Sequence, residues 1–398
     1  MKKQILITAS IMFFLLAASI AVILYGKGYK FGFDKGQVQL SQTGMLVATS
    51  SPDGAQVFIN GHLTTATDNT INLPPGEYTV AIVKEGYFPW KKKIKIQKEV
   101  VAKAEALLFP IAPKLESITS IGVEDPTLDP SGTRIAYTVA SQSATKNGVY
   151  VLDMTSRPIL TLQSASTQIV DDTTDYFSKA RLSWSPDGTE LLATISATPG
   201  NPTTYLLQAN QFNSTPQDIT ATLDTTTSLW KRQIQEKEKS RISTLNNRLK
   251  KIITQDFNIL QWSPDETKIL YQASRSASIP IIINPPLIGV DSTPQQRTIQ
   301  KGNIYVYDMK EDKNFKILNN VTTTKNNLMW LSDSKHIIYV EKGKINIMDY
   351  DGINMTTVYA GPFIDHYVFP WPDGSKIVIL TNLGNANTSP NLYTIGLK

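Results

Sequence analysis

A hairpin unit that recurs five times between residues 128 and 380 constrains the fold of this 398-residue chain more than any other feature. Each copy has a strand that usually bears an aromatic residue, a turn built on Pro-Asp-Gly or a variant of it, and an apolar return strand. Pro fixes φ in such a turn and Gly accepts positive φ. The copies cover residues 128–137, 182–193, 260–271, 328–339 and 369–380. Five copies predict a repeat architecture.

A third strand usually follows the hairpin, at residues 148–153, 302–308, 343–349 and 391–395. With this strand the unit resembles the TolB-type, WD-like β-propeller repeat. Each blade of a propeller buries its faces only against its neighbours, so the resemblance implies a closed ring.

The closure of that ring can be predicted from its two ends. The last blade has three strands, and residues 115–121 (LESITSI) precede the first repeat. We expect 115–121 to supply the missing fourth strand, so that the propeller covers residues 115–398. The motif count gives five blades. Six is the alternative, because a degenerate blade would fit between Asp187 and Asp265 or between Asp265 and Asp333.

Residues 45–109 alternate apolar and polar positions, which is typical of half-buried strands. Turn signals separate these strands, among them Pro52-Asp53-Gly54 and the hairpin pair Asn60-Gly61. The pattern predicts a small antiparallel β-sandwich, so the predicted fold class is all-β apart from helices at the N-terminus and in one insertion.

Three stretches of this sandwich, 51–61, 73–80 and 84–90, resemble the PEGA domain. The stretch Pro75-Gly76-Glu77-Tyr78 departs from the motif that gives the family its name, but it keeps a Pro-Gly turn entering a strand. The resemblance implies a bacterial surface or envelope module without known chemistry. Trp90, followed by three lysines, is expected at a solvated strand end, and contact with an anionic polymer or with headgroups is the alternative.

Residues 5–25 form an uncharged apolar run. About 20 helical residues at about 1.5 Å each cross a hydrocarbon layer of roughly 30 Å, so the run predicts a membrane-spanning helix. A cleaved signal peptide is the alternative, but its apolar core is shorter, about 7–15 residues. We expect residues 1–35 to comprise a cytoplasmic tip with Lys2 and Lys3, a single-pass anchor and a juxtamembrane spacer. The bulk of the chain would then lie outside the cell membrane.

Two insertions interrupt the repeats. Residues 228–253 place apolar side chains at three- and four-residue steps, which predicts an amphipathic helix that packs on the propeller. Its basic polar face offers an alternative role, the binding of an anionic partner or membrane surface. Residues 276–300 are rich in proline and polar residues and are predicted to form a long loop that shapes the binding face.

Sequence signals for catalysis or cofactor binding are missing. The chain has no cysteine, and its histidines, His62, His336 and His366, have no metal-ligand spacing. No G-x-S-x-G elbow is present. The net charge of +5 is modest for this length and partly local, which argues against general nucleic-acid binding. We therefore expect no cofactor, no metal, no enzymatic activity and no nucleic-acid partner, and no site residue can be named.

The sequence leaves three hypotheses for function. The first is a membrane-anchored binding scaffold outside the cytoplasm, whose propeller presents an interaction surface to a protein or an envelope polymer. The second is a propeller enzyme that acts on glycans through inward carboxylates about 5–10 Å apart. The third is a structural surface stalk, which predicts no concave site in the insertions.

Overall fold

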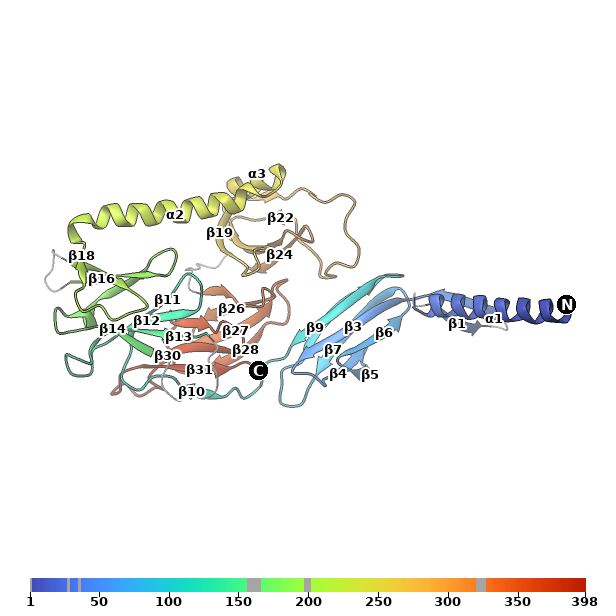
Figure 1. The fold of residues 1–398 in the computed structure, drawn as a ribbon, viewed down its shortest axis with the longest axis horizontal. Coiled ribbons are helices and arrows are strands. Elements are labelled where there is room, and N and C mark those ends of the chain that lie inside the picture. Colours follow the sequence, from blue (N-terminus) through green and yellow to red (C-terminus); the bar gives the residue numbers. More distant parts are fainter. Residues whose placement is uncertain (1, 27–28, 35–36, 156–165, 197–201, 320–326) are drawn as a thin grey trace. The chain divides into compact units, whose positions relative to one another are not determined.

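The computed structural model describes residues 2–26, 29–34, 37–155, 166–196, 202–319 and 327–398, and it describes side chains from residue 7 to 23 and from residue 43 onward. The chain forms two compact units (Figure 1). The first unit comprises residues 1–108 together with 283–294, and the second comprises 109–282 together with 295–398.

The first unit begins with helix α1 (Lys2–Gly26), followed by the hairpin of β1 (Tyr29–Asp34) and β2 (Gln37–Gln42). In the part of the chain that the structure describes, no helix meets both the length and the apolar character needed to cross a membrane, so the predicted span at 5–25 is not borne out. The flanking Lys2 and Lys3 lie outside the residues with described side chains.

A β-sandwich follows the hairpin. One sheet has the order β6-β3-β9 and the other the order β5-β4-β7-β8. The pairing is antiparallel, as predicted, except that β3 and β9 run parallel. The strands are β3 (Gly44–Ser51), β4 (Gln56–Ile59), β5 (His62–Ala66), β6 (Asn69–Leu73), β7 (Gly76–Val83), β8 (Trp90–Ile96) and β9 (Val101–Leu107).

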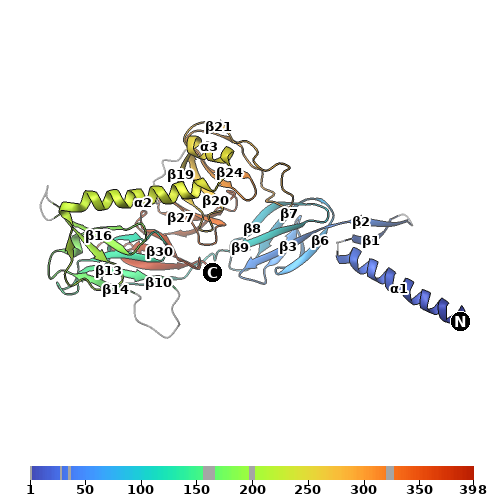
Figure 2. The same cartoon turned by 45° about the horizontal axis from the view of Figure 1, so that its top comes forward.

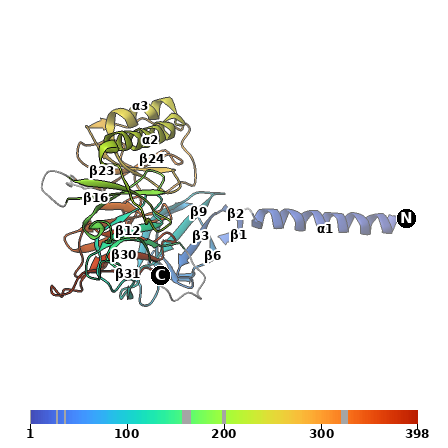
Figure 3. The ribbon, with the colours of Figure 1, turned by 60° about the vertical axis from the view of Figure 1, so that its left-hand side comes forward.

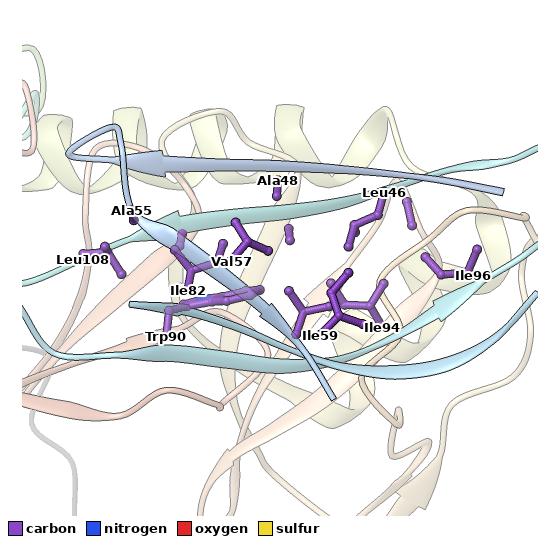
Figure 4. Close-up of a cluster of buried hydrophobic side chains, with 14 residues drawn as sticks. Leu46, Ala48, Ala55, Val57, Ile59, Ile82, Trp90, Ile94, Ile96 and Leu108 are labelled. Carbon is purple, nitrogen blue, oxygen red and sulfur yellow. The ribbon is translucent and has the colours of Figure 1, made fainter. Parts of the chain in front are cut away.

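The sandwich core consists of the inward residues of both sheets (Figure 4). Leu46 and Val57 are fully buried, and Trp90 is only 5% exposed. The expectation of a solvent-facing Trp90 is therefore wrong. Its side chain alternates with the lysines of β8, so the indole points into the core while Lys91 is exposed.

Residues 283–294, which come from the second predicted insertion, pack within the first unit. Asp291 forms an ion pair with Lys92 at 2.8 Å, and both side chains are largely buried. The Ser292 hydroxyl accepts a hydrogen bond from the backbone N–H of Lys95 at 2.9 Å. This N–H belongs to β8, an edge strand of its sheet, so the segment covers part of an otherwise open edge.

The second unit contains five four-stranded antiparallel sheets, here named A to E in the order of their first strands. Sheet A has β11 (Glu124–Leu128), β12 (Arg134–Val139), β13 (Gly148–Asp153) and β14 (Ser166–Asp171). Sheet B has β15 (Arg181–Trp184), β16 (Glu190–Ile195), β17 (Thr203–Gln208) and β18 (Gln217–Asp218). Sheet C has β19 (Phe257–Trp262), β20 (Lys268–Ala273), β23 (Ile304–Asp308) and β24 (Lys313–Leu318).

Sheet D has β25 (Leu328–Trp330), β26 (His336–Glu341), β27 (Lys344–Asp349) and β28 (Thr356–Ala360). Sheet E has β29 (Val368–Pro370), β30 (Lys376–Thr381) and β31 (Asn391–Gly396), and its fourth strand is β10 (Leu115–Ser117). Leu115 pairs with Ile395 and Ser117 with Tyr393. The predicted pairing of residues 115–121 with the last repeat is thus confirmed for 115–117.

Neighbouring sheets share apolar cores. One cluster joins sheets A and B, a second joins A and E, and a third joins C and D. Sheets D and E also approach closely, because a Cβ on Gly374 would lie 3.0 Å from the Ser332 hydroxyl. The sheet pairs A–B, A–E and C–D therefore bury faces against each other, as the repeat pattern predicts.

The connection between sheets B and C contains helices rather than strands (Figures 2 and 3). The short 3-10 turn η2 (Thr220–Thr222) leads into α2 (Leu223–Ser243) and α3 (Asn247–Asp256). The 3-10 turn η1 (Phe177–Lys179) precedes sheet B, and the short strands β21 (Ala277–Ser278) and β22 (Thr298–Ile299) pair inside the second insertion. In the described residues, neither interval that the sequence left open holds a sixth four-stranded sheet.

The first insertion differs from the prediction of one continuous helix over 228–253. The chain leaves the helix at Thr244 and restarts at Asn246, whose side chain accepts a hydrogen bond from the Arg248 N–H and caps α3. Leu249 and Ile253 of α3 are buried in the core of sheet C, whereas α2 has no buried residue. The predicted packing therefore holds for α3 and, through the half-buried Ile242, for the C-terminal end of α2.

Candidate functional site

The turn between the first two strands of each sheet sets the local frame of the site. In sheet B the backbone N–H of Ser185 donates to the Glu190 carbonyl. In sheet D the backbone N–H of Leu331 donates to the His336 carbonyl in the same way. The Asp of the motif stabilises the turn: Asp187 accepts hydrogen bonds from the Ser185 hydroxyl and from the Thr189 N–H and hydroxyl. The aspartates of the repeat thus have a structural role.

The pKa values of these aspartates agree with that role. Hydrogen bonds from Ser185 and Thr189 lower the pKa of Asp187. Burial alone would raise the pKa of Asp265, but hydrogen bonds from Ser263 and Thr267 lower it to about 2. Both carboxylates are therefore ionised acceptors at neutral pH and are poor candidates for a general acid.

The residue before this turn ends the first strand of its sheet. It is Trp184 in sheet B, Trp262 in sheet C and Trp330 in sheet D. In sheet E the tryptophan lies one position later in the repeat. The backbone N–H of Trp371 donates to the Lys376 carbonyl, which is the bond that Ser185 makes in sheet B. In sheet A the position is occupied by Leu128.

The first strands of sheets A, C, D and E, together with α2 and α3, surround a cavity of about 1250 Å³. Its walls are rich in aromatic and proline side chains. These are Phe257, Trp262, Trp330, Tyr367, Phe369, Trp371, Pro126, Pro130, Pro264, Pro370 and Pro372. In the described part of the chain, no residue that lines this cavity comes from the second insertion at 276–300.

The indole N–H groups of the three equivalent tryptophans have different partners. Trp184 Nε1 donates to the Thr127 carbonyl of sheet A at 3.1 Å. Trp262 Nε1 donates to the Glu238 carboxylate of α2 at 3.0 and 3.1 Å. Trp330 is 5% exposed and lines the cavity, and its Nε1 is one of the buried polar atoms without a hydrogen-bond partner in the described residues. A buried donor without an acceptor costs about 1–3 kcal/mol.

The charged groups on the cavity wall are bonded within the protein. Asp129 accepts hydrogen bonds from the Thr133 and Arg134 N–H groups, and the Arg134 guanidinium lies 3.6 Å from its carboxylate. Glu238 is bound by Trp262, and Arg241 pairs with Glu266 at 2.6 Å. The Arg241 guanidinium also lies 5.9 Å from the centre of the Trp262 ring.

Several neutral polar groups of the wall are bonded within the protein as well. The Gln261 side chain accepts a hydrogen bond from the Trp330 backbone N–H, and the Ser263 hydroxyl donates to Asp265. The Thr254 hydroxyl donates to the Lys250 carbonyl, and the Tyr367 hydroxyl donates to Asp125. Burial first, and then Asp125, raise the pKa of Tyr367 to about 12, so this hydroxyl is protonated at neutral pH.

Helix α2 contributes Ile234, Glu238 and Arg241 to the cavity. It is otherwise largely exposed, including the basic residues Lys231 and Lys237 that the sequence offers to an anionic partner. The first predicted insertion is thus part of the concave site, which the stalk hypothesis does not expect.

The sequence named no site residue, and the structure shows why. The aromatic residue of each repeat is visible in the motif, and its recurrence next to the turn was the available signal. Its hydrogen-bond state depends on the neighbouring sheet or helix, as the comparison of Trp184 with Trp330 shows. Spacing along the chain does not carry that information.

Comparison with known proteins supports the resemblance of the sandwich to the PEGA domain. Residues 43–110 match the PEGA domain family. The β-sheet region that follows structurally resembles TolB-type and WD-like propellers. Comparison with curated proteins gave no significant match.

Three solved structures illustrate this resemblance. TolB from Acinetobacter baumannii is 15% identical, with a TM-score of 0.24, over 81% of this chain and 60% of its own length. A putative TolB from Agrobacterium tumefaciens is 15% identical, with a TM-score of 0.23, over 69% of this chain and 78% of its own length. The Cps50 (Swd1) β-propeller domain from Myceliophteria thermophila is 8% identical, with a TM-score of 0.26, over 72% of this chain and 100% of its own length. The chain therefore spans 60% of the length of the first of these proteins.

Proposed function

We propose that this protein is a non-enzymatic binding scaffold located outside the cytoplasm, in which residues 115–398 form a five-bladed propeller. The partner, a protein or an envelope polymer, binds in the cavity between the first strands of the blades. The observation that carries this proposal is the convergence of Trp262, Trp330 and Trp371, from three different sheets, on one cavity of about 1250 Å³.

The size and the lining of the cavity support a large partner. Pockets for small molecules measure about 300–1,000 Å³, whereas this cavity measures about 1250 Å³. Tryptophan and tyrosine are enriched among the residues that dominate the energetics of protein interfaces. Trp262, Trp330 and Trp371 converge on one cavity from three different sheets.

The lining also favours binding over glycan hydrolysis. In the described residues, Asp129 and Glu238 are the carboxylates of the wall, and both already accept hydrogen bonds from the protein. A glycosidase needs one carboxyl group to protonate the leaving group and another to attack or to activate water. Carboxylates held as acceptors by internal donors are poorly placed for either task.

We further propose that the N-terminal segment attaches the protein to the cell membrane. The support is the uncharged run at 5–25 and the exposure of the apolar residues of α1, among them Phe13 and Phe14 at 72% and 74%. Exposed apolar surface of this kind marks a site that contacts a membrane or another protein. Protease added to intact cells should digest residues 43–398. Protection until lysis would contradict the location outside the cytoplasm.

The binding proposal is tested by filling the cavity. Thr254 lies on α3, has an exposed side chain and lines the cavity, so Thr254→Trp should obstruct it without disturbing a core. Lys251→Trp places the same side chain at an exposed position of the same helix that is not among the lining residues. The full-length chain and both variants, immobilised in detergent, are incubated with solubilised cell-envelope components.

The expected result is a partner that the wild type and Lys251→Trp retain and that Thr254→Trp loses. Equal retention by both variants, or no partner above the level of a bare support, would overturn the binding proposal. Circular dichroism of the variants checks that their folds are intact.

A further inference from the structure

We infer that helix α2 is a hinged lid over the cavity, held in place by two side chains near its C-terminal end. Four residues of this helix, Ile234, Glu238, Arg241 and Ile242, line the cavity. The movement of the lid can be measured without a partner, so this part of the inference goes beyond the proposed function. The second part, that the lid closes on a bound partner, rests on that function.

Little tertiary packing holds α2 in place. None of its 21 residues is buried, and Ile242 near its C-terminal end is half-buried against the core of sheet C. By contrast, α3 buries Leu249 and Ile253 in the same core. Helices in proteins are stabilised mainly by the packing of an apolar face. We therefore expect α2 to open at a much lower free energy than α3.

Bonds within α2 add little stability. Its N-cap residue, Thr222, makes no capping hydrogen bond with its side chain. Residues 225–227 near the start of the helix are all threonine, which is a poor helix former. Arg232 and Glu236 form an ion pair at 4.0 Å, but their side chains are 68% and 70% exposed, and the order with the cation first is the less favourable one. The position of α2 therefore depends on its contacts with the rest of the chain.

Two side chains of α2 provide these contacts, and they are here called the latch. The Glu238 carboxylate accepts hydrogen bonds from Trp262 Nε1 at 3.0 and 3.1 Å. Arg241 pairs with Glu266 at 2.6 Å, and its guanidinium lies 5.9 Å from the centre of the Trp262 ring. In the part of the chain that the structure describes, no other side chain of α2 forms a hydrogen bond or ion pair with a residue beyond the helix and its N-cap. Both latch contacts lead to sheet C.

The backbone changes conformation at both ends of α2, which runs from sheet B to α3 (Figures 1 and 2). The 3-10 turn η2 precedes the helix, and at the other end the helix stops at Thr244, before Asn246 caps α3. A few residues at the ends of an element are enough to absorb the change of backbone angles in a hinge. Release of the latch would therefore free α2 while α3 stays packed on sheet C.

The inner face of α2 is incompletely covered. Ile234 lines the cavity and is 58% exposed. Trp230, four residues earlier on the same face, is half-buried. A partner in the cavity would bury more of this apolar surface, which favours the closed position of the lid once the partner is bound. Segments of low local stability beside a binding site commonly serve as lids.

Hydrogen–deuterium exchange of the full-length chain in detergent, followed by mass spectrometry, tests the lid. In the wild type, the amides of α2 should be protected at least about 10-fold less than those of α3, because α2 opens without unfolding the sheets. Glu238→Ala removes the acceptor of the latch and should lower the protection of α2 about 3- to 30-fold further. Arg241→Ala removes the more exposed contact and should lower it about 2- to 5-fold.

Glu236→Ala is the matched control. It makes the same substitution on the same helix, at an exposed carboxylate outside the latch, and it should change the protection of α2 less than about twofold. The protection of α3 and of sheet C serves as an internal reference for the whole fold in every variant. An α2 as well protected as α3, equal effects of Glu238→Ala and Glu236→Ala, or equal losses in α2 and α3 would each overturn the inference.

The partner captured from the cell envelope tests the second part. Its binding should raise the protection of α2 in the wild type, because the lid closes on it. Unchanged protection of α2 in the complex would overturn the closing of the lid. This failure is distinct from that of the binding proposal. If Thr254→Trp loses the partner while Glu238→Ala leaves α2 protected, the binding function stands and the lid is wrong. If no partner is retained while α2 exchanges as expected, the hinged helix stands and the binding function is wrong.

Discussion

Sheets B and D are built on the same repeat, yet they place the same residue type in opposite states. Trp184 of sheet B and Trp330 of sheet D both end the first strand before the turn. Trp184 donates to a carbonyl of the adjacent sheet, whereas the buried indole N–H of Trp330 has no acceptor among the residues that the structure describes. The same repeat position therefore links sheet B to sheet A through Trp184 and lines the cavity in sheet D through Trp330.

The start of the second strand differs between the two sheets as well. Sheet B places Glu190 there, bonded to the Gln208 amide at 2.9 Å. Sheet D places His336, whose ring contacts Asp333 at 2.5 Å and Asp349 at 3.3 Å. Burial alone would lower the pKa of His336, but the two aspartates raise it to about 9. Sheet D thus combines a buried ionic cluster with a buried indole N–H that has no acceptor in the described residues.

The largest effect is expected from removing the buried cation. His336→Ala removes the cation that lies between Asp333 and Asp349, and breaking such a pair costs about 3–5 kcal/mol. The corresponding change in sheet B, Glu190→Ala, removes one hydrogen bond to an amide and should cost about 1 kcal/mol. Urea unfolding followed by tryptophan fluorescence measures both. Equal losses would remove the distinction between the two sheets.

The pH dependence of stability should follow His336. Its pKa is raised from the ordinary value of 6.5 to about 9 in the folded state. The contribution is therefore fully present below pH 6.5 and is lost as the pH rises through about 9. The loss should approach about 3 kcal/mol in the wild type. In His336→Gln the free energy of unfolding should change much less between pH 6.5 and 10. A parallel decline in this variant would contradict the account.

The two tryptophans should respond to the same substitution to different degrees. Both rings lie in apolar cores, so Trp→Phe removes buried volume at either position. Trp184→Phe also leaves the Thr127 carbonyl without its donor and should cost about 1–3 kcal/mol more than Trp330→Phe, whose donor has no acceptor in the described residues. Thermal unfolding of the two variants checks this difference. An equal or larger loss in Trp330→Phe would show that its N–H is satisfied in the folded protein.

The smallest effect is expected at the turn. Gly188 of sheet B has φ of 73°, and a Cβ there would lie 3.1 Å from the Arg134 guanidinium. Gly188→Ala should cost about 1–2 kcal/mol because a side chain disfavours this conformation. In sheet D the same position is Ser334 with φ of 58°, whose hydroxyl accepts a hydrogen bond from the Asp265 N–H. Ser334→Ala should therefore also destabilise, through the loss of that bond.

Much of the fold could be predicted from local signals. The repeated turn and its flanking apolar strands located the first two strands of every sheet, because their side-chain period and their turn residues are written in adjacent positions. The pairing of Leu115 with Ile395 followed from one further argument, that a ring of blades cannot leave an open end.

The remaining features depend on contacts that are distant in sequence. Trp90 resembles an exposed residue beside three lysines, but strand alternation and the opposite sheet bury it. The break between α2 and α3 depends on the cap at Asn246 and on the docking of Leu249 against sheet C. Whether the Trp330 indole N–H finds an acceptor depends on the side chains and carbonyls of the neighbouring sheet. No local pattern encodes these three outcomes.

The most direct test of the cavity as the binding site is the affinity of the captured envelope partner for three proteins. These are the full-length wild type, Thr254→Trp and Lys251→Trp, compared by surface plasmon resonance. The account predicts that Thr254→Trp, at a position that lines the cavity, loses most of the affinity and that Lys251→Trp retains it. Unchanged affinity for Thr254→Trp, or an equal loss in both variants, would contradict it.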